Sequence, residues 1–230
     1  MSEATKEGSA MGDEPEVLDE LDYDEDGVFD DPDLLQPASP RWHRRTAAEM
    51  IVSGVLGLIA SFVLSIEAWQ LKGDGNAVFS CDINQVISCG AVARTWQAHL
   101  LGFPNAFLGI FFETIVLVLS ISMFAGVRFP RWIMLGANAL YSIGLFFALW
   151  LFSQSYFVIH ALCPWCLLIT FTTTLVWAGL TRINVRDGHL PATAGMRRFV
   201  AAGYDWYVTG GFCLLLVLMI VLRYGPSLLA

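Results

Sequence analysis

Four of the five cysteines form two pairs, Cys81 with Cys89 and Cys163 with Cys166, and each pair lies where a hydrophobic segment meets a polar one. The second pair belongs to a Cys-Pro-Trp-Cys motif. At the start of a helix, the sulfurs of such a motif lie about one turn apart and can close a disulfide. The positive end of the helix dipole favours the thiolate of the first cysteine. Two dithiols at one face of a membrane suggest electron transfer between thiols in water and an acceptor dissolved in lipid.

The first pair has a looser spacing, with seven residues between Cys81 and Cys89. Thiol–disulfide exchange passes through a mixed disulfide and needs an accessible thiolate, so a mobile pair suits a shuttle between a soluble thiol and Cys163. Two structural disulfides and a four-cysteine zinc site are the alternatives. Seven intervening residues are many for a zinc pair, and we expect no metal. Cys213 lies within an apolar segment, where we expect a small packed residue.

The composition indicates a membrane protein, because 56% of the residues are hydrophobic and several apolar runs approach the length of a membrane span. The runs are continuous rather than alternating. They therefore predict helices, which satisfy their own backbone hydrogen bonds in lipid. We expect an all-α integral membrane protein that contacts the lipid bilayer and no nucleic acid. The expected spans cover about residues 50–68, 106–127, 132–152, 157–180 and 206–222.

Charge is segregated along the chain. Residues 1–40 hold 14 acidic side chains and one basic side chain, whereas residues 41–230 hold 7 acidic and 12 basic ones. The first segment lacks the apolar surface needed to order it, so we expect a disordered acidic tail. This tail is either a solvated charged segment without a specific role or a segment that regulates the protein or binds a partner. A membrane domain is expected over residues 41–225, followed by a short outer tail over residues 226–230.

The basic residues predict the orientation, because they concentrate on the cytoplasmic side of membrane proteins. Three clusters precede the first span, join the second to the third, and join the fourth to the fifth. They comprise Arg41, Arg44, Arg45, Arg128, Arg131, Arg182, Arg186, Arg197 and Arg198. The opposite side has only Lys72, Arg94 and Arg223. The amino terminus is therefore expected inside and the carboxy terminus outside. Both cysteine pairs then lie on the outer face, where disulfides persist.

The first outer loop, residues 69–105, is long for a simple connection, and such loops are usually functional. Ser88 is placed to cap a helix that begins near Cys89. Apolar residues recur at helical spacing from Ala91 to His99. We therefore expect a short amphipathic helix in this loop, on the membrane surface.

Three motifs follow one another within residues 48–225. They are Cys81-Asp82 with Ser88-Cys89-Gly90, then Gly102-Phe103-Pro104-Asn105, then Cys163-Pro164-Trp165-Cys166. In this order they resemble bacterial members of the vitamin K epoxide reductase family. The resemblance implies a four-helix transmembrane bundle around a quinone, capped by the loop helix, with a fifth transmembrane helix as in bacterial relatives.

The resemblance also implies roles for individual residues. Cys166 would face the quinone, and Cys163 would exchange with the loop pair. Asn105 would donate a hydrogen bond to a quinone carbonyl. Thr95 matches a Ser or Thr that lies near the site in relatives.

Two positions depart from vertebrate relatives. Thr170 replaces a Tyr four residues after the second motif cysteine, which favours a plain quinone, menaquinone or ubiquinone, over an epoxide. Glu113 lies in the second span, where vertebrate relatives carry an aromatic residue. Ionisable residues inside a membrane are functional candidates. Glu113 would either relay protons to the quinone ring or be a protonated carboxyl bonded to a neighbouring helix.

We therefore expect a thiol oxidase of the bacterial plasma membrane. It would reoxidise an extracytoplasmic thioredoxin-like (DsbA-like) protein and reduce a membrane quinone, supporting disulfide formation in exported proteins. Many bacterial relatives continue into a fused thioredoxin-like domain, whereas this sequence ends at Ala230, so we expect a separate partner. The alternative is a non-catalytic scaffold with two structural disulfides. A convergent quinone-linked oxidase would carry its Cys-x-x-Cys in the first outer loop, which reverses the order found here.

Overall fold

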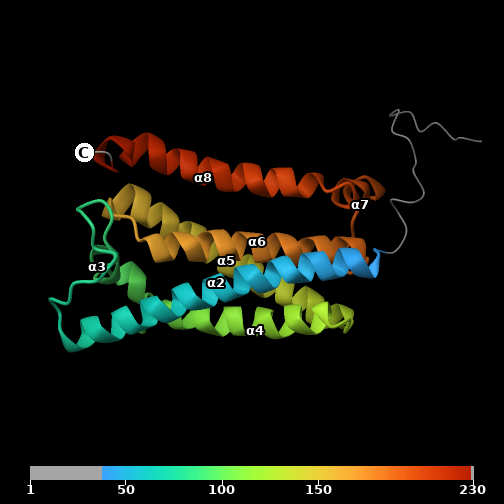
Figure 1. The fold of residues 1–230 in the computed structure, drawn as a ribbon, viewed down its shortest axis with the longest axis horizontal. Helices are drawn as coiled ribbons and strands as arrows, with labels where there is room; N and C mark the ends of the chain where they lie inside the picture. Colours follow the sequence, from blue (N-terminus) through green and yellow to red (C-terminus); the bar gives the residue numbers. More distant parts are fainter. Residues whose placement is uncertain (1–37, 229–230) are drawn as a thin grey trace, which may run out of the picture. The chain divides into compact units, whose positions relative to one another are not determined.

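Helices make up most of the computed structural model, which describes residues 38–228 (Figure 1). In chain order they are α2 (Pro40–Gly73), α3 (Cys89–Ala93), the 3-10 helix η1 (Trp96–His99), α4 (Ala106–Phe124), α5 (Arg131–Gln154), the π-helix η2 (Ser155–Ile159), α6 (Pro164–Arg186), α7 (Ala194–Ala201) and α8 (Tyr204–Leu228). The acidic tail expected over residues 1–40 and the short tail over residues 226–230 lie largely outside the described residues.

Five of these helices are long and apolar enough to cross a membrane: α2, α4, α5 with η2, α6 and α8. Within residues 38–228 the only extended pairing is one isolated bridge between Ile87 and Leu162. The fold is therefore an all-α, multi-pass membrane protein, and the fold class predicted from the apolar runs is confirmed.

Polar side chains and prolines set where these helices begin. The N–H of Trp42 donates to the Ser39 hydroxyl at 3.2 Å, and Pro40 occupies the first turn of α2, where its missing donor costs little. Pro164 plays the same part at the start of α6. A sulfur takes the place of the capping hydroxyl there, because the N–H of Cys166 donates to Cys163 Sγ at 3.3 Å. Helix α6, the fourth membrane span, thus begins on the dithiol motif itself.

The fourth span begins later than the expected residue 157. The chain from Ser155 to Ile159 continues α5 as a π-helical turn, and His160 then adopts a left-handed conformation with φ of 59°. A helix cannot run through the next turn, because Pro164 lacks an N–H and disfavours helical backbone in the residue before it. Hydropathy misses this break, since the residues around it are as apolar as those in the helices.

Helix α2 packs against α4 and α6, and α6 also packs against α5, so these four helices form a bundle (Figure 1). Its main apolar core is buried around Met50 of α2, Val116 of α4, Met134 of α5 and Leu180 of α6. Helix α8 lies at the edge of the bundle, where it contacts α6 and α7. Only 6% of its spanning segment is buried, as expected for a fifth helix that faces lipid.

One buried cation joins three helices at one end of this bundle. The guanidinium of Arg182 in α6 lies over the rings of Trp42 and Trp206, at 5.1 and 4.9 Å from their centroids. Its Nε lies 2.6 Å from Asp205 at the start of α8. Cation–π contacts and an ion pair therefore fasten α8 to α6 and α2.

The two ends of the bundle differ in chemistry. The start of α2, the end of α6 and helix α7 lie at one end, and the arginines expected on the cytoplasmic side belong to this end (Figure 1). The loop with α3, the start of α4 and the start of α6 lie at the other end, together with both cysteine pairs. The cysteines and most of the basic charge are thus separated by the length of the helices.

Candidate active site

The expected loop helix begins where its cap was predicted, because the Ser88 hydroxyl accepts the N–H of Ala91 at 3.0 Å. It is interrupted, however: α3 ends at Ala93, and the 3-10 helix η1 follows from Trp96. Cys89, at the first position of α3, forms a disulfide with Cys81 across a Cα–Cα distance of 5.7 Å. Cys89 is therefore paired within the loop in this structure, and not with Cys163.

Asp82 organises the loop around this disulfide. Its Oδ1 accepts hydrogen bonds from the Ser88 hydroxyl at 2.7 Å and the Gly90 N–H at 2.8 Å, and its Oδ2 accepts one from the Phe79 N–H at 2.9 Å. Gly90 allows this close approach, because a Cβ there would lie 2.8 Å from the Arg94 guanidinium and 2.9 Å from Oδ2, and both side chains would have to shift. One carboxylate therefore links the segment before Cys81 to the start of α3.

These hydrogen bonds also set the charge of Asp82. Partial burial raises the pKa of its carboxyl, but the three hydrogen bonds and the positive charge of Arg94 outweigh this effect, and the pKa lies below its usual value. The Arg94 side chain also donates to the carbonyls of Gly75 and Ala77, at 3.3 and 2.8 Å. An ionised carboxylate and one cation hold the two arms of the loop together.

A short backbone pairing holds the loop against the start of α6. The N–H of Ser88 donates to the Leu162 carbonyl at 3.0 Å, and the N–H of Leu162 donates to the Val86 carbonyl at 2.7 Å. Because Ser88 precedes Cys89 and Leu162 precedes Cys163, this bridge sets the two cysteines side by side. Sequence reasoning did not find it, since a pairing of two or three residues leaves no periodic signal.

The sulfurs of Cys163 and Cys89 lie 3.4 Å apart, within the roughly 3–3.5 Å from which reacting atoms can attack. Cys163 and Cys166 carry free thiols, and Cys163 is only 2% exposed. Cys89 is 1% exposed, and Cys81 is 6% exposed. The four cysteines predicted to react are therefore together, in a state with the loop pair oxidised and the inner pair reduced.

A cavity of about 160 Å³ lies among α2, α4, α5, α6 and the loop, and the side chains of Cys89, Cys163 and Cys166 line one part of it. Its lining is mostly apolar. A single water needs only ~10–15 Å³ of such space, so the cavity has room for a larger molecule. An apolar cavity with few polar groups beside two thiols suits the ring of a quinone.

Asn105, the residue predicted to bind the quinone, lines this cavity. Its Nδ2 donates to the Gln97 carbonyl at 2.6 Å, and its backbone N–H donates to the Ala98 carbonyl at 3.0 Å. Its Oδ1 is buried and has no hydrogen-bond partner among the described residues. A buried amide oxygen normally has a partner. The free Oδ1 suits a quinol hydroxyl, and the second hydrogen on Nδ2 suits a quinone carbonyl.

Glu113 also lines the cavity, eight residues after Asn105 and therefore about 12 Å further along α4. Its carboxyl is 1% exposed, and the Tyr141 hydroxyl of α5 donates to its Oε2 at 3.1 Å. Gly57 of α2 makes room for it, because a Cβ there would lie 2.5 Å from Oε1. The expected hydrogen bond between Glu113 and a neighbouring helix is therefore present, and the position of Glu113 on the cavity also fits a proton relay.

Thr95 is placed differently from Asn105 and Glu113. It is not among the residues that line the cavity, and its hydroxyl donates to the Val92 carbonyl at 2.7 Å. A contact of Thr95 with the quinone stays a prediction. Thr170 does line the cavity, and its hydroxyl donates to the Cys166 carbonyl at 3.0 Å. The position that carries a Tyr in vertebrate relatives therefore borders the same space.

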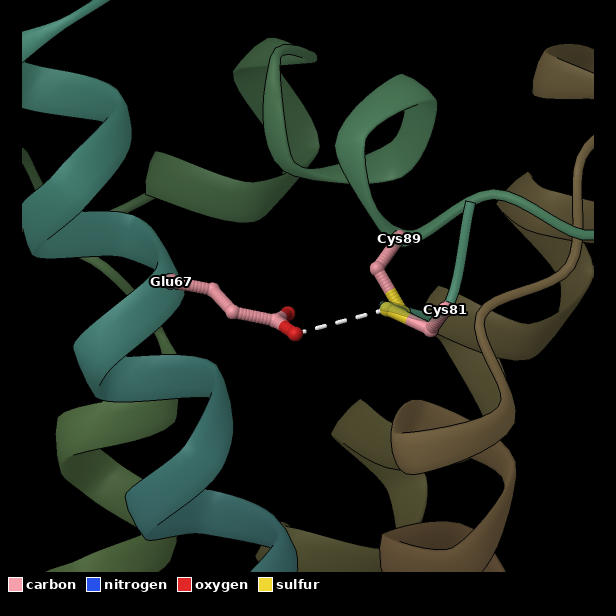
Figure 2. A group of neighbouring side chains, drawn as sticks. All are labelled: Glu67, Cys81 and Cys89. Atoms are coloured by element: carbon pink, nitrogen blue, oxygen red, sulfur yellow. Dashed lines mark hydrogen bonds between the residues drawn. A yellow bond between two sulfur atoms is a disulfide. The ribbon is translucent and has the colours of Figure 1, made fainter. Parts of the chain in front are cut away.

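Glu67 is a site residue that sequence reasoning missed. It lies near the end of α2, is 6% exposed, and places Oε1 3.4 Å from Cys81 Sγ (Figure 2). The rule that drew attention to Glu113, an acid inside an apolar run, applies equally to Glu67. The donor atoms of Glu67, Cys81 and Cys89 lie within 4.8 Å of one another. Both sulfurs are in a disulfide, however, so neither supplies the thiolate that a metal would need.

Five apolar helices, a disulfide and two adjacent thiols, of which Cys163 is buried, define a multi-pass membrane protein with a thiol redox centre. The model of the vitamin K epoxide reductase family matches residues 48–180, more than half of the chain. The protein belongs to this family, which implies membrane disulfide and quinone chemistry, and it is an oxidoreductase. The match ends within α6, so α7 and α8 lie outside it. No curated protein matches the chain.

Proposed function

We propose that this protein oxidises the thiols of an extracytoplasmic thioredoxin-like protein and passes the electrons to a membrane quinone. The observation that carries this proposal is the 3.4 Å separation of Cys163 Sγ from Cys89 Sγ, beside an apolar cavity. A structural disulfide needs no free thiol at attacking distance. A relay of electrons from the loop to the helices needs such a thiol.

The relay begins at the loop pair. The dithiol of the partner reduces the Cys81–Cys89 disulfide and itself becomes a disulfide, so two electrons enter the loop and the partner gives up two protons. Cys81 is the cysteine that meets the partner in this proposal, because Cys89 is the one that contacts Cys163. The apolar side chains of Val78 and Ile83, 82% and 69% exposed, flank Cys81 and offer the partner a surface.

The second stage moves the electrons to the inner pair. The Cys89 thiolate attacks Cys163 of a Cys163–Cys166 disulfide, and Cys166 leaves as a thiolate that takes up a proton. The Cys81 thiolate then attacks Cys89, and Cys163 leaves as a thiolate that takes up the second proton. The products are a loop disulfide and an inner dithiol, which is the redox state of this structure.

The last stage returns the inner pair to a disulfide and releases two electrons and two protons. A bound quinone is the chemical class that takes up both. Cys166 lines the cavity at the start of α6, and Asn105 offers its amide to the ring oxygen. The direction is favourable, since a periplasmic oxidant near −120 mV passing two electrons to an acceptor roughly 100 mV higher releases on the order of 5 kcal/mol.

Glu113 is proposed as a proton relay to the quinone. Its carboxyl lies on the cavity, and the Tyr141 hydroxyl holds it in place. Glu113→Gln keeps the shape and removes the acid, so quinol formation should slow while the thiol exchange between the cysteine pairs is unchanged. Full turnover in this variant would show that the carboxyl only bonds α4 to α5.

Three features support an outward-facing site in the bacterial plasma membrane. The cysteines lie at the end of the bundle opposite to most of the arginines, and arginine-rich ends face the cytoplasm. The loop pair is oxidised, which fits an oxidising compartment. The carboxy-terminal end of α8 lies at the cysteine end (Figure 1). Labelling of Cys163 or Cys166 by a reagent confined to the cytoplasm would overturn this orientation.

An anaerobic assay tests the whole proposal. The purified full-length protein is mixed with a reduced thioredoxin-like protein and a water-soluble quinone analogue, and quinol is followed by its absorbance. Serine at any one of positions 81, 89, 163 and 166 should abolish turnover. Cys213→Ser is the matched control, because Cys213 lies in α8 and does not line the cavity. Quinol formation that survived Cys166→Ser would refute the relay and favour a scaffold with structural disulfides.

A further inference from the structure

We propose that Glu67 is the proton-transfer group of the loop disulfide: it gives a proton to Cys81 when the disulfide opens and takes it back when the disulfide closes. The inference rests on the proposed function, because it concerns the step that joins the two cysteine pairs. It assigns a catalytic role to a residue that lines no part of the quinone cavity.

The contact geometry requires a proton on the carboxyl. Glu67 Oε1 lies 3.4 Å from Cys81 Sγ, and Figure 2 shows the side chain extending from α2 toward the disulfide. A disulfide sulfur carries no hydrogen and can only accept. The contact is therefore a hydrogen bond only if Glu67 is the donor, as a neutral carboxylic acid.

The second carboxyl oxygen supports the same protonation state. Glu67 Oε2 is buried and has no hydrogen-bond partner among the described residues, on a side chain that is 6% exposed. Burying an ionised carboxylate without a partner is costly, whereas a neutral carboxyl that donates to Cys81 leaves only an unpaired acceptor. Around it, Phe79 and the sulfurs of Cys81, Cys89 and Cys163 form an apolar cluster, which also excludes water.

The groups around Glu67 belong to three other elements, because the Cys89 sulfur of α3 lies within 4.8 Å of its carboxyl. Asp82, from the loop, and the Cys166 thiol of α6 interact electrostatically with the carboxyl. Cys81, from the loop, makes the direct contact. Of these groups, only Cys81 is placed within hydrogen-bond distance to exchange a proton with Glu67.

The proton cycle balances over one turnover. When the partner resolves its mixed disulfide with Cys81, the S–S bond breaks, its electron pair stays on Cys81 Sγ, and Glu67 supplies the proton. Glu67 is then a carboxylate beside a thiol. When Cys81 later attacks the Cys89–Cys163 disulfide, Glu67 removes the thiol proton, the Cys81–Cys89 bond forms, and Cys163 leaves as a thiolate. Glu67 ends protonated, as it began.

The size of the effect follows from thiol chemistry. A free cysteine thiol has a pKa of about 8.5, so only about 3% is thiolate at pH 7 without a base. A base that deprotonates Cys81 during attack can therefore accelerate closure about thirtyfold at pH 7. This advantage should shrink as the pH rises, because the thiolate then forms without help.

A single-turnover experiment separates this inference from the proposed function. The full-length protein is reduced at all four reactive cysteines, the reductant is removed, and two equivalents of a quinone analogue are added anaerobically. The first quinol comes from the inner pair and needs no exchange with the loop. The second quinol requires Cys81 and Cys89 to reduce the inner disulfide, and this slower phase is the one that uses Glu67.

Glu67→Gln, which preserves the size of the side chain, should leave the first phase unchanged and slow the second about thirtyfold at pH 7. The difference from the unmodified protein should nearly vanish by pH 9. Ser65→Ala, two residues away on α2, is the matched control and should behave like the unmodified protein, since the Ser65 hydroxyl bonds only within its helix.

The two failures are distinguishable. An unmodified protein that forms no quinol in either phase refutes the proposed function. If the first phase is normal but the second phase of Glu67→Gln is as fast as that of the unmodified protein, the role of Glu67 is refuted. The role of Glu67 is also refuted if the second phase of Glu67→Gln is slower by the same factor at pH 7 and at pH 9. A packing defect would slow the reaction at both pH values, whereas proton transfer is no longer needed at pH 9.

Discussion

Replacing Asp82 by asparagine should loosen the loop without removing any cysteine. The carboxylate accepts two hydrogen bonds on Oδ1 and one, from Phe79, on Oδ2. Asparagine has a single acceptor oxygen, so at least one of the three hydrogen bonds is lost, and the remaining ones no longer have a charged acceptor. Hydrogen bonds to charged groups contribute about 1.5–3 kcal/mol when buried. Because Asp82 is only partly buried, we expect about 1.5–2 kcal/mol, which corresponds to loop opening about 10 to 30 times more often.

Amide hydrogen exchange of the protein in detergent or nanodiscs measures this opening. The protection of the Phe79 and Gly90 amides should fall by the same factor in Asp82→Asn. Asp74→Asn is the matched control, since Asp74 lies in the same loop and is exposed, and its carboxylate accepts the N–H of Asn76 alone among the described residues, at 3.0 Å. Equal protection in the two variants would refute the argument that Asp82 holds the loop.

The same carboxylate predicts a pH dependence. Its hydrogen bonds and Arg94 lower the pKa of Asp82 in the folded loop below the usual value. Its contribution to stability is therefore complete above the pKa of the unfolded chain, about 3.9, and is lost as the pH falls through the lower folded value. Protection should be constant from pH 5 to pH 8 and decline below about pH 4. Asp82→Asn should show no such acid-induced loss.

Two further substitutions test the sulfur geometry and the helix packing. Cys166→Ser leaves the Cys163 thiol with one reactive neighbour, the Cys89 sulfur at 3.4 Å. A Cys89–Cys163 disulfide should therefore accumulate and release the other loop cysteine as an alkylatable thiol, which mass spectrometry of proteolytic fragments detects. Gly57→Ala places a Cβ 2.5 Å from the Glu113 carboxyl and should destabilise the protein by about 1–3 kcal/mol in thermal unfolding.

Hydropathy and cysteine spacing predicted much of this molecule, because both depend on local sequence. Membrane spans appear as long apolar runs, and the Cys-Pro-Trp-Cys motif indicates its own helix start. The capping of α3 by Ser88 was predictable for the same reason. The contact between Cys89 and Cys163 was expected only in outline, as exchange of Cys163 with the loop pair, since a distance across 74 residues leaves no local pattern.

Other parts of the site could not be predicted from local sequence. The bridge from Ile87 to Leu162 depends on two irregular segments that meet only in the folded bundle. The π-helical end of α5 is as apolar as the helix before it. Glu67 was the exception, since its signal was present: a carboxyl inside an apolar run. Its importance emerged only once the fold placed Cys81 beside it.

Helix α3 connects the thiol chemistry to the cavity, and this restricts how a partner can act. Cys89, at its first position, lines the cavity and contacts Cys163. A partner that lifted α3 would break this contact and admit water to the site. The bridge to Leu162 and the hydrogen bonds of Asp82 hold α3 down. Exchange must therefore begin at Cys81, with its exposed neighbour Val78, while α3 stays in place over the inner dithiol.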